Sequence, residues 1–274
     1  MKSNIFKIAA LAVVLPAIIS SCKKGCTDPI ANNYDAKAKK ENSSCTYDTI
    51  IEQKSDISLE LYHMHGASTF SLGTDYSDDF GNTYQFTRAQ LYLSSLTYMD
   101  DAMNVIATPA AYALVDPNTT TYDFGTVPSG ETVHMLSLNV GVDSTLNAAD
   151  PAVSGVTYPA LNYQTPSIHW NWNSGYVFIA IEGKVDLDAS GTYDAGETFI
   201  MHVGGNQFLA ENTGLMSHFD PVAGMTHTIS MDLDWSKLLT GIDLATQNST
   251  HTMDNMPLAT SVSTNAQSIL SMHM

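Results

Sequence analysis

The sequence predicts an all-β fold, an antiparallel sandwich or barrel. Residues 56–234 hold runs of β-forming residues with partial alternation of apolar and polar side chains. Clusters of Gly, Pro, Asn and Asp separate these runs, as turns do between strands. Helical periodicity is found only near the C-terminus, at residues 257–271, and it is moderate there. Strands that follow one another without helices between them favour antiparallel sheets.

Composition bounds the size and the partners of the protein. A chain of 274 residues has room for one large β domain with a small appendage, or for two modest domains. Its formal charge of -17 excludes nucleic acid as a partner, because binding there depends on Lys and Arg that neutralise phosphates. An acidic surface suits divalent or soft cations, and the 9 His and 13 Met are a further hint of cation binding, since Met is usually sparse.

The N-terminus indicates export and lipid anchoring. The apolar stretch 8–19 follows a lysine-bearing start and is too short to remain in a bilayer. It ends in Ile-Ser-Ser-Cys, which resembles a bacterial lipobox and predicts a lipoprotein signal peptide over residues 1–21. Lipidation of Cys22 by several chains would anchor the protein in the cell envelope. We expect the outer membrane facing the periplasm, with the cell surface as the alternative; an ordinary secretory signal is the alternative to lipidation.

Residues 22–50 are expected to form the anchor and a stapled spacer. If Cys22 takes lipid, Cys26 and Cys45 remain as a pair that an oxidising compartment can close into a disulfide. The stretch 25–47 resembles a short module of exported Bacteroidetes proteins, with its GCTD, NYD and SC motifs. A loop this small cannot bury a core, so the disulfide is expected to hold it.

The expected strands of the main domain follow in chain order, and each run is bounded by turn residues. They lie at residues 56–65, 84–100, 131–142, 174–188, 197–205 and 225–235. No repeat of 20 to 50 residues is evident, which excludes a solenoid or propeller.

One loop between two of these strands has the spacing of a calcium site. In "DLDASGTYDAGE", residues 186–197, oxygen donors occupy every ligand position of a twelve-residue calcium loop, and a glycine stands at the sharp turn. The expected ligands are Asp186, Asp188, Ser190, the Thr192 carbonyl, Asp194 and Glu197. Because strands flank the loop, the ion would be structural. The alternative is a solvated acidic hairpin tip.

The histidines often stand beside methionine, as in "HMH", "MH" and "SMHM". Imidazole with thioether is a ligand set that suits copper, especially Cu(I). Composition alone is weak evidence for copper binding, because Met also fills gaps in a core.

Several segments, in order over residues 57–270, resemble the MbnP-like family of exported copper-binding proteins. These segments are "LELYHMHGASTFSLG", "YQFTRAQLYLSSLTY", "YALVD", "LNVGVDSTLN", "HWNWNSGYVFIAIEG", "FIMHVGG" and "HTMDNMPLATSVSTNAQSI". The resemblance implies an antiparallel β-sandwich over residues 56–274, with a short C-terminal helical segment, and it implies copper binding.

Carried over by position, the resemblance makes His63 and His202 the first copper ligand candidates and His251 a third. In related copper proteins a tryptophan at the site can be oxidised, which makes Trp170 and Trp172 candidates for the wall of the site. Ile168 stands where the family often has methionine, so the ligand set here can differ.

Strand alternation divides the Trp-x-Trp motif between two faces. Trp170 and Trp172 are two positions apart and share one face, whereas His169 lies on the other. His169 is therefore ranked below His63 and His202 as a ligand. The simpler interpretation of the tryptophans is core packing.

The sequence does not indicate an enzyme. It has no Gly-x-Ser-x-Gly elbow, His-Glu-x-x-His pair or phosphate-binding glycine loop. The leading prediction is a copper-binding exported lipoprotein for scavenging, storage or delivery, with a redox or transport protein as partner for the metal. The alternative is a calcium-stabilised β-sandwich that serves surface interaction without copper.

Overall fold

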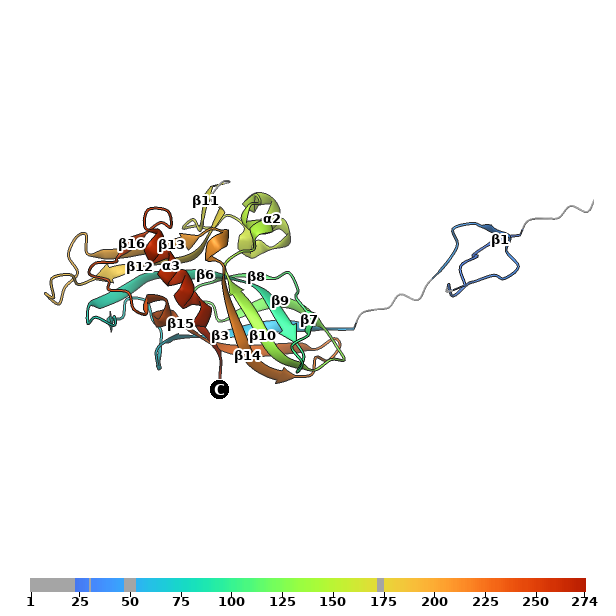
Figure 1. Cartoon of the computed structure of the whole chain (residues 1–274), viewed down its shortest axis with the longest axis horizontal. Helices are drawn as coiled ribbons and strands as arrows, with labels where there is room; N and C mark the ends of the chain where they lie inside the picture. Colours follow the sequence, from blue (N-terminus) through green and yellow to red (C-terminus); the bar gives the residue numbers. More distant parts are fainter. Residues whose placement is uncertain (1–22, 30, 47–52, 172–174) are drawn as a thin grey trace, which may run out of the picture. The chain divides into compact units, whose positions relative to one another are not determined.

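The computed structural model describes residues 23–29, 31–46, 53–171 and 175–274. The chain divides into two compact units, residues 1–51 and residues 52–274 (Figure 1). Two residues singled out from the sequence, the expected lipidation site Cys22 and the second tryptophan Trp172, lie outside the described residues.

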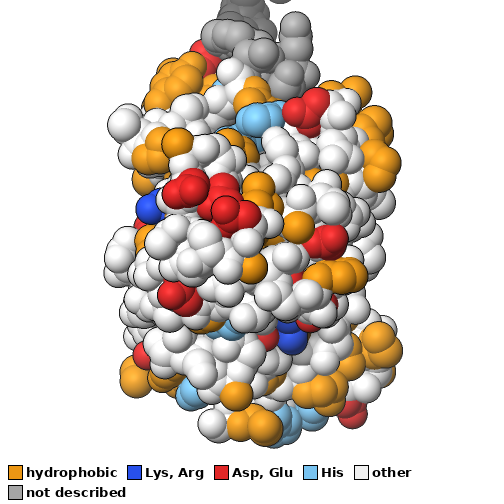
Figure 2. Space-filling view, turned by 90° about the vertical axis from the view of Figure 1, so that its left-hand side faces the viewer, with side chains coloured by type: hydrophobic (Ala, Val, Ile, Leu, Met, Phe, Trp, Pro, Cys, Tyr) orange, Lys and Arg blue, Asp and Glu red, His pale blue; other side chains and the backbone are white. Residues whose placement is uncertain are grey.

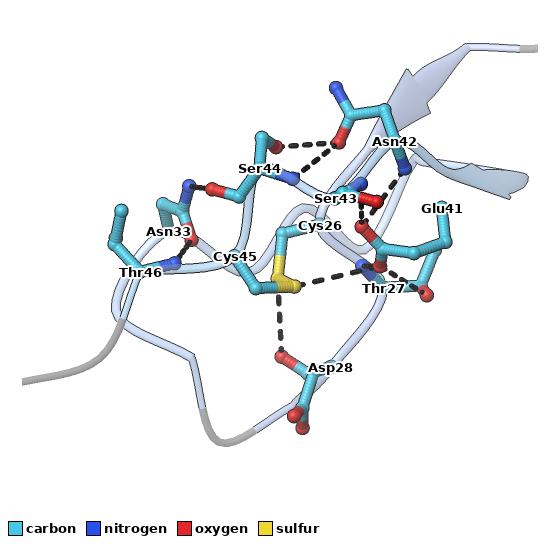
Figure 3. Close-up of a disulfide and its surroundings, with 10 residues drawn as sticks. All are labelled: Cys26, Thr27, Asp28, Asn33, Glu41, Asn42, Ser43, Ser44, Cys45 and Thr46. Carbon is cyan, nitrogen blue, oxygen red and sulfur yellow. Dashed lines mark hydrogen bonds between the residues drawn. A yellow bond between two sulfur atoms is a disulfide. The ribbon is translucent and has the colours of Figure 1, made fainter.

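A disulfide closes the small N-terminal unit. Strands β1 (Lys24–Gly25) and β2 (Lys40–Glu41) pair in parallel, and Cys26 and Cys45 are joined with an S–S distance of 2.07 Å, which confirms the expected pair. Glu41 lies beside the bridge, where its carboxylate accepts hydrogen bonds from the Thr27 backbone N–H at 2.7 Å and hydroxyl at 2.9 Å (Figure 3). These bonds lower the pKa of Glu41 to about 2. An ionised Glu41 therefore ties the two halves of the loop together.

The large unit is a sandwich of two sheets that enclose one core. The larger sheet has the order β14-β10-β6-β12-β13-β16, with β5, β7 and β8 paired to β6 and β11 paired to β12. Its strands are β5 (Tyr76–Ser77), β6 (Thr83–Met99), β7 (Val105–Ala107), β8 (Tyr112–Val115), β10 (Val133–Val140), β11 (His169–Asn171), β12 (Gly175–Val185), β13 (Thr198–Gly204), β14 (Ala210–Phe219) and β16 (Ser249–Thr250). Nearly all neighbours are antiparallel, and only β13 and β16 run in parallel.

The smaller sheet has the order β17-β15-β3-β4, with β9 paired to β3. Its strands are β3 (Lys54–His65), β4 (Ser68–Thr69), β9 (Thr121–Pro128), β15 (Thr226–Asp234) and β17 (Leu270–Met272). Strands β3 and β15 pair in parallel over nine residues, from Thr226↔Asp56 to Asp234↔Met64. The expected antiparallel sandwich is confirmed, and this parallel pair is an exception within it. It is possible because a long segment, which includes most of the larger sheet, separates the two strands in the chain, so no hairpin has to join them.

Alternating apolar residues of both sheets fill the core. On β3, Ile57, Leu59 and Leu61 are at most 1% exposed, and the polar residues between them face the other way. Trp235, the third tryptophan of the chain, is fully buried. The expected strands are all present. The strands that were not expected include β9 and β14; in β14, exposed positions and a glycine of positive φ, Gly214, interrupt the alternation.

Short helices lie at the ends of the strands. These are α1 (Ser144–Asn147), α2 (Pro151–Thr157), α3 (Met256–Asn265) and the 3-10 turns η1 (Pro159–Leu161), η2 (Asn206–Phe208), η3 (Trp235–Leu239) and η4 (Ala266–Ser268). Helix α3 begins where Asn255 accepts a hydrogen bond from the Leu258 N–H, and it packs against β13 (Figure 1). The helical segment expected over residues 257–271 ends earlier, because Leu270 pairs with Leu233 of β15 as part of β17. Among the described residues, no helix is long and apolar enough to cross a membrane.

Candidate metal site

His202 projects from the outer face of the larger sheet. On β13 the neighbours Met201 and Val203 are buried in the core, so His202 points away from it and is only partly exposed. Its Nε2 lies 2.9 Å from Oε1 of Glu182, a residue of the adjacent strand β12. A carboxylate on a mostly apolar strand thus holds the imidazole by one nitrogen.

His251 stands beside His202. The ring centroids are 5.1 Å apart and the rings are nearly perpendicular, at 88°. The parallel pairing of β16 with β13 brings His251 here, because Thr250 lies opposite Met201. Thr252 then fixes the turn, since its hydroxyl donates to the His202 carbonyl at 2.9 Å and accepts from the Gly204 N–H at 3.1 Å. Residues almost fifty positions apart therefore form a histidine pair.

A carboxylate contacts one nitrogen of each ring and leaves the other nitrogen available. Glu182 faces Nε2 of His202, and Asp254 faces Nδ1 of His251 at 3.3 Å. Within the described part of the chain, Nδ1 of His202 and Nε2 of His251 have no hydrogen-bond partner. A carboxylate that accepts from one N–H of an imidazole leaves the lone pair on the other nitrogen, which is the usual arrangement around a metal-binding histidine.

Burial is the largest influence on the protonation of His202. It lowers the pKa of His202, against the opposing effect of the hydrogen bond to Glu182, so the neutral ring is favoured. Burial alone would raise the pKa of Glu182, but the hydrogen bonds from Arg88 and His202 bring it below its ordinary value. The pair is thus a neutral imidazole beside an ionised carboxylate, and a neutral imidazole is the form that binds metal.

Arg88 supports Glu182 from the next strand, β6. Its Nη1 donates to Oε1 of Glu182 at 2.7 Å, its Nε to the Gln90 side chain at 2.8 Å, and its Nη2 to the Ser167 carbonyl at 3.1 Å. The guanidinium therefore links the histidine pair to the segment that leads into the Trp-x-Trp motif. A cavity of about 420 Å³ borders this group and is lined by Arg88, Gln90, Asp116, Pro166 and Glu182, among others.

Trp170 of β11 lies over Gly204, which is two positions from His202 on β13. A Cβ on Gly204 would stand 2.9 Å from the Trp170 ring, so the indole lies directly over that glycine. Gly204 and His202 share a face of β13, which places the half-buried Trp170 on the histidine side of the sheet. Trp170 also packs against the core. His169 lies instead against Tyr176, with ring centroids 4.8 Å apart.

His63 lies on the other sheet, in a different environment. It is 7% exposed, its Nε2 donates to the Thr119 carbonyl at 3.0 Å, and its Nδ1 accepts from the Trp235 indole N–H at 3.1 Å. Both ring nitrogens are occupied, so a metal could bind only after one bond breaks. Among the described residues, no hydrogen bond or ring contact joins His63 to His202 or His251.

The acidic loop between β12 and β13 gathers three of its expected ligands. Asp186, Asp188 and Glu197 each offer an oxygen within 4.8 Å of the others. Backbone N–H groups at residues 187, 190, 191 and 194 donate to these carboxylates. Ser190 and Thr192 bond to one another at 3.0 Å, and Asp194 contributes its N–H to Glu197. Figure 2 views the end of the domain toward which this loop extends, and acidic side chains gather on that face.

Sequence reasoning missed the carboxylates and the arginine. Glu182 had a visible signal, because it is the acidic residue within the buried strand 175–185. Arg88 and Asp254 had none, since only the strand register and the turn after β16 bring them to the histidines.

The two packed sheets make this domain a β-sandwich, and the outward histidines with their carboxylates make it one with a candidate metal site. The MbnP family model matches residues 54–254, and the chain belongs to the MbnP family. Among solved structures, MbnP from Methylosinus trichosporium is similar, with 18% identity, a TM-score of 0.49, and coverage of 70% of this chain and 80% of that one. Comparison with curated proteins gives no match.

Proposed function

We propose that this protein is an exported, lipid-anchored copper-binding protein that scavenges, stores or delivers the metal and performs no catalysis. The observation that carries the proposal is the His202–His251 pair, in which each ring keeps one nitrogen free and has a carboxylate at the other. Membership of the MbnP family supports a role connected with copper.

The donor chemistry of the pair fits copper. Imidazole nitrogens bind copper in either oxidation state, whereas calcium and magnesium select oxygen. His202 would bind through Nδ1 and His251 through Nε2, while Glu182 and Asp254 hold the opposite nitrogens. Such outer carboxylates orient the ring and increase the basicity of the binding nitrogen. Trp170 would shield one side of the ion, because its indole lies on the same face of β13 as His202.

His63 supports the fold in this proposal. Its two hydrogen bonds fix the ring between Thr119 and Trp235, and its burial matches a structural role. The family resemblance makes it a ligand candidate, so the experiment below includes it.

Export and anchoring are supported by the lipobox ending at Cys22 and by the disulfide of the N-terminal unit. A disulfide persists in an oxidising compartment such as the periplasm. Anchored there, the protein would pass copper to a redox or transport partner.

We further propose that the acidic loop binds a structural calcium ion. Asp186, Asp188 and Glu197 converge, and the first and last of these are 8% exposed. A divalent cation would offset the repulsion between their charges. Adding a calcium chelator to the full chain should lower Tm. The double variant Asp188→Asn/Glu197→Gln should start at that lower Tm and not respond to the chelator; equal melting curves throughout would contradict the site.

The copper proposal is tested by metal analysis and Cu(I) competition titration of the full chain. Wild type should bind copper, and His202→Ala/His251→Ala should lose one equivalent. The matched control is His273→Ala, because His273 also contacts a carboxylate, Asp232, at 2.7 Å but stacks on a tyrosine and not on a second histidine. If His63→Ala alone loses bound copper while its fold stays intact, the copper site lies on the other sheet.

A wild-type chain that binds no copper would contradict the proposal. Combined with a chelator-sensitive Tm, that result would support the alternative function, a calcium-stabilised surface interaction module.

A further inference from the structure

A second histidine pair lies on the opposite part of the larger sheet, where β10 pairs with β14. The Nδ1 atoms of His134 and His218 are 3.3 Å apart, and the ring centroids are 4.7 Å apart at an angle of 71°. His218 is exposed and His134 is half-buried. Among the described residues neither ring makes another hydrogen bond or ring contact, and the Asp100 carboxylate lies close enough to His134 to interact with it electrostatically.

An irregularity in the strand pairing brings the two rings together. Val133 lies opposite Phe219, and the next matched pair is Met135 opposite Met216. One residue of β10 therefore faces two residues of β14, which is a β-bulge. Val133 and Phe219 point into the core, so His134 and His218 beside them point to solvent. The bulge thus places both rings on one outward surface, 84 residues apart in the chain.

The separation of the two nitrogens matches a shared metal ligand pair. Imidazole nitrogens bind Zn²⁺ at about 2.0–2.1 Å, and two such ligands at a tetrahedral angle are about 3.3 Å apart. In the metal-free protein this distance is also that of a long N–H···N hydrogen bond, in which one ring donates to the other. A metal would take the place of that shared proton.

A row of methionines lies next to the pair on the same outward face. Met135 is directly opposite Met99 of β6 and Met216 of β14, so the three side chains are neighbours across three strands. The adjacent matched residues Leu136, Tyr98 and Leu215 are buried, and the methionines are exposed or half-buried. Met216 is the most exposed of the three, whereas Met99 and Met135 are half-buried. Thioethers are soft ligands, which select copper over harder ions.

We propose that His134 and His218 form a second copper site, on the outer face of β10 and β14. Both Nδ1 atoms bind the ion, and the thioethers of Met99, Met135 and Met216 favour Cu(I). The site shares no residue with the His202–His251 pair, so it can be tested independently of the function proposed above.

The test compares double variants of the full chain by Cu(I) competition titration and by electron paramagnetic resonance of the Cu(II) form. His134→Ala/His218→Ala should bind one equivalent less than wild type, while His202→Ala/His251→Ala keeps that equivalent. Combining all four substitutions should abolish both. Since both rings of the second pair face solvent, the variant should fold, which its circular dichroism and Tm verify.

The spectroscopy identifies the ligands. Cu(II) in His202→Ala/His251→Ala should show coupling to two nitrogens, and this signal should vanish when His134 and His218 are also replaced. Met99→Leu/Met135→Leu/Met216→Leu should weaken Cu(I) about tenfold or more and leave Cu(II) binding within about twofold.

Three results would overturn the inference. One is equal copper stoichiometry in wild type and His134→Ala/His218→Ala. The others are binding of Zn²⁺ with exclusion of copper, and a Cu(II) spectrum without nitrogen coupling in His202→Ala/His251→Ala. The Zn²⁺ result would identify the pair as a zinc site, and the spectrum without nitrogen coupling would identify it as a hydrogen-bonded contact only.

Discussion

His63 and His202 stand in similar sequence contexts, yet the two sheets give them different roles. Each is a strand residue beside a methionine, at "YHMH" and "IMHV". His63 is enclosed, with a carbonyl at one nitrogen and an indole N–H at the other. His202 faces outward, with a carboxylate at one nitrogen and a second histidine ring nearby. A histidine is available to a metal only where the fold leaves one of its nitrogens unpaired.

The largest expected effect falls on stability, at the enclosed histidine. His63→Ala leaves the Trp235 N–H buried without an acceptor, which costs about 1–3 kcal/mol, and leaves a cavity besides. We expect a loss of about 2–4 kcal/mol in the free energy of unfolding, measured by urea denaturation. His63→Asn keeps an acceptor near the Nδ1 position and should lose less. Equal losses in the two variants would show that the indole bond contributes little.

The next effect falls on copper affinity, at the outward histidine. Glu182→Gln removes the charge that orients His202, and loss of such an outer partner lowers metal affinity about 10–100-fold. Competition titration measures this change, with Glu60→Gln as the control, because Glu60 is a carboxylate of the other sheet that bonds to Ser230. An unchanged copper affinity in Glu182→Gln would show that this carboxylate does not contribute to the copper site.

The pH dependence should be shared by both histidines. Burial lowers the folded-state pKa of His63 and of His202 below the ordinary value of 6.5. The unfolded chain therefore binds protons first as the pH falls. The stability of the fold with both rings neutral is complete above about pH 6.5, and it is lost as the pH falls through the folded-state pKa of each ring. Thermal denaturation between pH 8 and 5 should show a falling Tm, with a weaker dependence in His63→Asn; an identical slope in this variant would contradict the assignment.

The smallest effect is expected at Arg88. Lysine keeps the charge but cannot donate to Glu182, Gln90 and Ser167 from one planar group. Arg88→Lys should weaken copper by a few-fold, less than Glu182→Gln does, in the same titration. A larger loss than in Glu182→Gln would mean that the position of the segment around Ser167 matters more than the carboxylate.

Local patterns accounted for much of the fold and for part of the site. The β runs at 56–65 and 225–235 became β3 and β15, because alternation and turn residues act over a few positions. The Cys26–Cys45 bridge followed from counting cysteines. The convergence of Asp186, Asp188 and Glu197 followed from spacing within one loop. Metal binding at any of these residues stays a prediction.

What the sequence alone determined is therefore local: strands, turns, the stapled module and the acidic loop. The tertiary structure decided which histidines meet. His202 with His251, and His134 with His218, become neighbours only through a parallel strand pair and a β-bulge. It also decided that His63 is enclosed by Trp235, 172 residues away. The physical reason is that side-chain alternation sets the face of each strand, whereas partner and register are set by core packing over the whole sandwich.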